Sequence, residues 1–83
     1  MPLHYVEPRF LPQVWPIAAP LLQKAIDLEP GAITIEQAEY FIRTGRTFLL
    51  VWEEPEVGIT GAVTVEFMDY PRERVAHVNL MGG

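Results

Sequence analysis

The segment 47–81 decides the fold, and it reads TFLLVWEEPEVGITGAVTVEFMDYPRERVAHVNLM. Apolar and polar residues alternate along it with a period close to two, which is typical of extended chain. Two turn signals, EPEVG at 54–58 and DYPRE at 69–73, divide it into three runs rich in β-branched and aromatic residues. We therefore predict three antiparallel strands at 47–53, 59–68 and 74–81.

The side chains of the first two predicted strands indicate how the sheet would be packed. In 47–53, Leu49 and Val51 share one face, and Phe48, Leu50 and Trp52 share the other. Because both faces are apolar, we expect both to be covered. In 59–68, the residues predicted to share one apolar face are Ile59, Val63, Val65 and Phe67, and Gly61 suggests a β-bulge.

A helical period precedes this segment. Residues 11–28 carry apolar residues at helical spacing, which predicts an amphipathic helix. Pro16 and Pro20 would break or kink it, because an interior proline removes a backbone hydrogen bond. A stop signal at 29–31 should end this helix.

A second helix is predicted at 35–44. Thr34 and Gln37 have the spacing of a capping box, and Gly45 suits a left-handed C-cap. A short β-prone run at 3–7, followed by Pro8, predicts a further strand at the start of the chain. The predicted fold class is therefore α+β, in the order β-α-α-β-β-β with an antiparallel meander, within one domain spanning residues 1–83.

Composition excludes several classes of protein. The chain has 83 residues, no cysteine and a formal net charge of −5. Its six basic residues are scattered, whereas nucleic-acid binding needs clustered cations, so no nucleic-acid partner is expected. No apolar run approaches the roughly 20 residues of a membrane span, and no secretory signal is evident. We expect a soluble protein of the cytoplasm, with no membrane partner and no metal.

Five short passages resemble the amino-terminal half of GNAT-type acetyltransferase-like proteins, especially those encoded by tailed bacteriophages and prophages. The passages are VWP at 14–16, PLL at 20–22, GAVTVE at 61–66, DYPRERVA at 69–76 and GG at 82–83. The resemblance implies a partial GNAT-like domain, found in the host cytoplasm or in a virion if phage-encoded. In that family a glycine-rich turn and helix follow the last of these strands, and their N–H groups hold the acyl-CoA pyrophosphate.

This sequence stops before that turn, so the resemblance implies no cofactor for the chain alone. In a completed domain the cofactor would be acetyl-CoA, bound in part by backbone groups of Leu80 and Met81. Glu66 and His77 are the candidate catalytic residues, each as a general base toward a substrate amine. Each also has a structural interpretation, as a solvated glutamate near a strand end and as a hydrogen-bonded histidine.

Other polar and aromatic residues leave similar alternatives open. Asn79 would orient a ligand or satisfy a backbone group, and Tyr70 would act as an acid or pack over a sheet end. Trp15 and Trp52 are predicted to belong to the core rather than to stack on a ligand. The acidic cluster at 53–56 is interpreted as a solvated loop.

The edge of the last strand gives the leading hypothesis for function. From Val75 to Met81 this strand would present unpaired N–H and C=O groups beside apolar side chains, so something should cover it. We therefore predict a structural or interaction protein, plausibly a phage assembly component, that pairs with another protein or with itself through this edge. The alternative is an N-acetyltransferase fragment that transfers acetyl from acetyl-CoA to an amine when the missing half is supplied.

Overall fold

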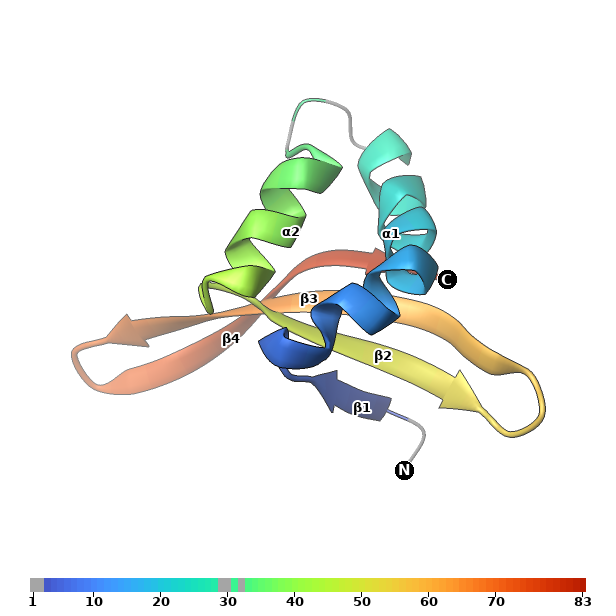
Figure 1. Ribbon diagram of the computed structural model, residues 1–83. Helices are drawn as coiled ribbons and strands as arrows, with labels where there is room; N and C mark the ends of the chain where they lie inside the picture. Colours follow the sequence, from blue (N-terminus) through green and yellow to red (C-terminus); the bar gives the residue numbers. More distant parts are fainter. Residues whose placement is uncertain (1–2, 29–30, 32) are drawn as a thin grey trace.

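The computed structural model describes residues 3–28, 31 and 33–83, and it confirms the predicted α+β class (Figure 1). In chain order the elements are β1 (Leu3–Val6), the 3-10 turn η1 (Pro8–Phe10), α1 (Leu11–Leu28), α2 (Ile35–Arg43), β2 (Phe48–Glu54), β3 (Gly58–Tyr70) and β4 (Glu73–Gly82). Part of the predicted stop signal, residues 29–30, lies outside the described residues.

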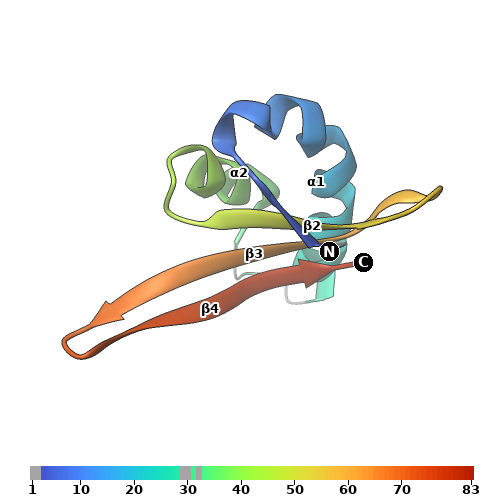
Figure 2. The ribbon, with the colours of Figure 1, turned by 90° about the horizontal axis from the view of Figure 1, so that it is seen from below.

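The four strands form one antiparallel sheet in the order β1-β2-β3-β4. The three strands of the predicted meander are confirmed, and β1 extends the sheet by pairing with β2, with Val6 opposite Leu49. Both helices lie on the same side of the sheet (Figures 1 and 2). The β3–β4 hairpin extends beyond the helices as an arm, which gives the molecule its longest dimension of 44 Å.

Helix α1 runs without a break from Leu11 to Leu28, although Pro16 and Pro20 lie inside it. The missing N–H groups of these prolines leave the carbonyls of Pro12 and Pro16 without their usual helical donors. All three prolines are exposed, so the lost bonds lie on the solvent side. The predicted interruption therefore takes the form of a curve, visible in Figures 1 and 2, rather than a break.

Helix α2 begins and ends where its sequence signals predict. Gln37 N donates to Thr34 Oγ1 at 3.2 Å, and Thr34 N donates to Gln37 Oε1 at 3.0 Å, which confirms the capping box. Gly45 has a φ of 84°, a conformation that favours glycine, and it turns the chain toward β2.

The hydrophobic core lies between the helices and the sheet. Leu22, Ile42 and Leu49 are its largest fully buried side chains. Trp15 packs against this core, as predicted. Neither helix, within the described part of the chain, combines the length and the apolarity needed to cross a membrane.

The opposite face of the sheet carries no helix among the described elements, so the prediction that both faces are covered is wrong (Figure 2). Trp52, predicted to be in the core, is 43% exposed on this face. The reason is that two helices of this size can cover only one face, and both lie on the side of Leu49 and Val51.

Two register shifts change which side chains share a face. Trp52 pairs with Gly61 but Glu53 pairs with Ile59, so Thr60 is an extra residue beside the predicted bulge at Gly61. Ile59 consequently packs against the core and does not share the face of Val63, contrary to the prediction.

The second shift lies between β3 and β4. Thr64 pairs with Leu80 while Val65 pairs with Val78, which makes Asn79 the extra residue. Leu80 N donates to Thr64 Oγ1 at 3.1 Å, so the side chain of Thr64 provides an acceptor where the ladder is disrupted.

Candidate functional site

The most extensive candidate site is the uncovered face of the sheet, here named the open face. Its apolar members are Leu3, Tyr5, Phe48, Leu50, Trp52, Val63, Val65, Phe67, Ala76, Val78 and Met81, which pair across all four strands. Met81 is 71% exposed and Val78 is 50% exposed. Trp52 and Phe67 are slightly less exposed than Val78. Contiguous exposed apolar patches of this size are uncommon on monomers, which makes the open face a candidate site.

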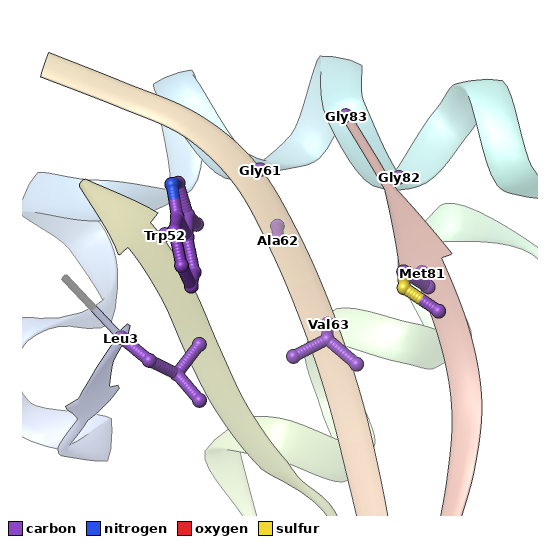
Figure 3. Close-up of a pocket in the computed structure, with 8 residues that line it drawn as sticks. All are labelled: Leu3, Trp52, Gly61, Ala62, Val63, Met81, Gly82 and Gly83. Atoms are coloured by element: carbon purple, nitrogen blue, oxygen red, sulfur yellow. The ribbon is translucent and has the colours of Figure 1, made fainter. Parts of the chain in front are cut away.

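One end of the open face is hollowed (Figure 3). The hollow has a volume of about 530 Å³, and Gly61 and Val63 of β3 form its floor. Trp52 and Leu3 stand on one side of this floor and Met81 on the other. Gly61 contributes no side chain to this floor, and the walls are apolar, so the hollow suits an apolar group.

The other end of the open face carries a row of aromatic rings. The ring centroids of Tyr5 and Phe48 are 5.8 Å apart, and those of Phe48 and Phe67 are 5.2 Å apart. This aromatic ridge crosses β1, β2 and β3, so the open face has a projecting part as well as a hollow part.

Charged side chains are few on the open face. Arg74 Nε donates to Asp69 Oδ1 at 2.7 Å, and this hydrogen bond together with the charge of Asp69 raises the pKa of Arg74 above its ordinary value. The Arg74 guanidinium also lies 6.0 Å from the Phe67 ring centroid. At the hollow end, Trp52 Nε1 donates to Glu54 Oε1 at 3.3 Å. The middle of the face is therefore uncharged.

A second, smaller cavity lies on the helix side, between α2 and strands β3 and β4. Its volume is about 310 Å³, and its polar lining consists of Arg46, Thr47, Thr64, Glu66 and Asn79. Asn79 Nδ2 donates to Glu66 Oε2 at 3.5 Å, a long hydrogen bond. The guanidinium of Arg46 lies 5.1 Å from the Phe41 ring centroid. A cation and a carboxylate thus line one cavity.

The register brings the two predicted catalytic residues together. Glu66 pairs directly with His77, and paired residues point to the same face of a sheet. Strict alternation along β4 would put His77, Asn79 and Met81 on one face, but Met81 lies on the other. The bulge at Asn79 puts His77 on the helix side and Met81 on the open face.

The remaining predicted residues are dispersed. The amide of Leu80 is engaged by Thr64, and Met81 lines the hollow of the open face. Tyr70 lies near the tip of the arm, where its hydroxyl donates to Met68 Sδ at 3.7 Å. His4 Nε2 is 3.6 Å from Glu53 Oε1. No group of three metal-ligating side chains occurs among the described residues.

Sequence reasoning missed Arg46 and Thr64 as members of the helix-side cavity. Arg46 follows Gly45, the left-handed residue after the C-cap Thr44, and its backbone N–H bonds to the carbonyl of Phe41, which places it at the C-terminal end of α2. The available signal for Arg46 was its position directly after the helix-ending Gly45, which places its side chain beside the last turn of α2. Thr64 had one too, because a threonine at an inward position of an apolar strand needs a hydrogen-bond partner.

Comparisons of the chain with protein-family models, with curated proteins and with solved structures gave no match.

Proposed function

We propose that this chain is an interaction protein, GNAT-like in its element order, that acts by pairing with a protein partner rather than by catalysis. The observation that carries the proposal is the open face, because β2 is apolar on both sides and the helices cover only one of them. Exposure of this surface to water is unfavourable by roughly 25 cal/mol for each Å². Covering it would drive an association, and the resemblance noted in the sequence favours an association within a phage-derived assembly.

The free edge of β4 supports the same proposal. Among the described strands β4 pairs only with β3, so the outer side of its exposed part, residues 73–79, offers N–H and C=O groups for strand addition. The other edge of the sheet is β1, which has only four residues. Short edge strands resist pairing with other chains, whereas β4 is long enough to bind one.

A strand-addition experiment tests this proposal. The probe is a synthetic peptide with the sequence of residues 73–82, and the readout is amide hydrogen exchange of β4 in the folded protein. We expect the peptide to slow exchange of the β4 amides that do not bond to β3. A matched peptide with alternate N-methylated amides should have no effect, because it cannot complete the ladder. Unchanged exchange with both peptides would count against pairing through this edge.

The helix-side cavity favours a second candidate function, an N-acetyltransferase fragment that is active when completed by its missing half. Glu66 lines the cavity, and His77 lies opposite it in the register, so a carboxylate and an imidazole are available for proton transfer. Acetyl-CoA would be the donor and an amine the acceptor. Because the resemblance implies no acetyl-CoA site in this chain alone, isothermal calorimetry with acetyl-CoA tests this candidate on the completed domain. Binding that survives Glu66→Gln would support it, and no heat at millimolar acetyl-CoA would reject it.

A further inference from the structure

We propose that the open face binds a second copy of this chain, face to face, in a two-fold symmetric sandwich of two sheets. This proposal rests on the proposed function. It adds the identity of the partner, and it places the contact on the open face rather than on the β4 edge.

The extent of the open face suits a weak, reversible dimer. Strands lie about 4.8 Å apart and advance about 3.3 Å for each residue, so four strands across the length of β2 span roughly 20 Å by 23 Å. The projecting rings of Tyr5, Phe48 and Phe67 make the accessible area larger than this plan area. The plan area is about 460 Å², which is comparable with the largest, often functional, apolar patches of monomers and smaller than the roughly 800 Å² that each partner of a standard interface contributes. We therefore expect the dimer to dissociate readily on dilution.

The shape of the open face is self-complementary. A two-fold interface requires that each copy carry both a projection and the recess that receives it. The hollow between Trp52 and Met81 lies at one end of the open face. The aromatic ridge of Tyr5, Phe48 and Phe67 lies at the other end. A two-fold axis through the middle of the face would bring the ridge of one copy over the hollow of the other. Sheets packed in this way lie about 10 Å apart, with interdigitated side chains.

The charges of the chain permit this contact. The charged residues at open-face positions of the described strands are Glu54, Asp69 and Arg74, and the last two are paired with each other. The net charge of −5 therefore resides almost entirely off the open face. Two copies repel each other at long range, and salt screens that repulsion over about 10 Å at 0.1 M. A basic partner on the same surface would instead be released by salt.

Sedimentation velocity of the purified chain, over about a hundredfold range of concentration, tests the inference. We expect a reversible monomer–dimer equilibrium whose dissociation constant falls when sodium chloride is raised. The substitution Val78→Glu puts a carboxylate in the centre of the proposed contact and should raise that constant at least about a hundredfold. Met81→Glu, at a still more exposed position, should act in the same direction.

The matched control is Ile17→Glu on α1, where the native side chain is 49% exposed, against 50% for Val78. It adds the same charge at the same exposure and should leave the dimer unchanged. Near-ultraviolet circular dichroism checks that each variant remains folded. A chain that is monomeric throughout, or a dimer that is equally sensitive to Ile17→Glu and Val78→Glu, would overturn the inference.

The failures of the two proposals are distinguishable. If the dimer survives both open-face substitutions and its β4 amides are protected from exchange, the contact lies at the strand edge. That result would support the proposed function and reject the open-face dimer. A monomer that binds the 73–82 peptide would likewise retain pairing through β4 while rejecting the second copy on the open face.

Discussion

Leu49 and Leu50 are consecutive residues of β2, yet their surroundings differ completely. Leu49 has no exposed surface beneath the helices, whereas Leu50 lies half-buried on the open face. Gly82 and Leu80 are likewise buried beneath the helices, whereas Gly61 and Val78 lie on the open face, where they are half-buried and exposed, respectively. The chemistry of the two faces is similar, so the contrast comes from what lies over each face. One face holds this molecule together, and the other is available to a partner.

The largest expected effect on stability is the loss from truncating Leu49, which should exceed the loss from truncating Leu50. Leu49→Ala should lower the free energy of unfolding by about 3 to 4 kcal/mol, because it leaves a cavity beneath the helices. Leu50→Ala should cost about 1 kcal/mol or less when measured at concentrations where the chain is monomeric. Urea denaturation followed by circular dichroism gives both values. Equal losses for the two variants would contradict the assignment of the faces.

The two glycines extend the comparison to backbone packing. A Cβ on Gly82 would lie within van der Waals overlap of the Leu21 carbonyl of α1, so Gly82→Ala should cost about 3 kcal/mol. A Cβ on Gly61 would meet the Trp52 Cβ at 3.4 Å, an ordinary contact. Gly61→Ala should therefore be neutral or stabilise the strand by about 0.5 kcal/mol. Thermal unfolding of both variants tests this, and a destabilised Gly61→Ala would show that the open face is less open than described.

Thr64 tests the polar group within the covered face. Thr64→Val keeps the shape but removes the acceptor of the Leu80 N–H, which is buried. We expect a loss of about 2 kcal/mol, because an unsatisfied buried donor has lost its hydration. Thr64→Ser retains the hydroxyl and is the control, with a loss of about 1 kcal/mol from the missing methyl. A Thr64→Val variant as stable as the native chain would mean that another acceptor reaches this amide.

The smallest expected effect is on the open face itself. Val78→Thr replaces a methyl with a hydroxyl at a half-exposed site, so monomer stability should change by no more than about 0.5 kcal/mol. The same variant should weaken self-association measurably, since the hydroxyl would be buried between the sheets without a defined partner. Chemical denaturation and sedimentation of one preparation separate these two effects.

Local signals in the sequence predicted the elements well. Thr34 and Gln37 predicted the start of α2, Gly45 predicted its end, and the alternation after Thr47 predicted β2. These features depend on residues a few positions apart, and the physical interactions that they encode are equally local.

The face assignments depended on long-range structure and were less predictable. The bulge at Asn79 follows from the pairing of β4 with β3, and nothing in the local sequence of β4 marks it. It puts His77 and Met81 on opposite faces of the sheet, and it brings Asn79 within reach of Glu66. Trp52 was misplaced for a related reason, because periodicity identifies an apolar face without showing whether an element lies over it.

The arm formed by β3 and β4 has a consequence for how the chain would be cut. Residues 67–79 are all exposed, and beyond the helices the arm is a bare two-stranded ribbon whose tip carries Arg72. Such a tip is where a protease enters first. Trypsin should therefore nick the chain after Arg72 before it reaches any bond under the helices, leaving β4 as a separate peptide that stays in place through its ladder with β3 and its contact with α1.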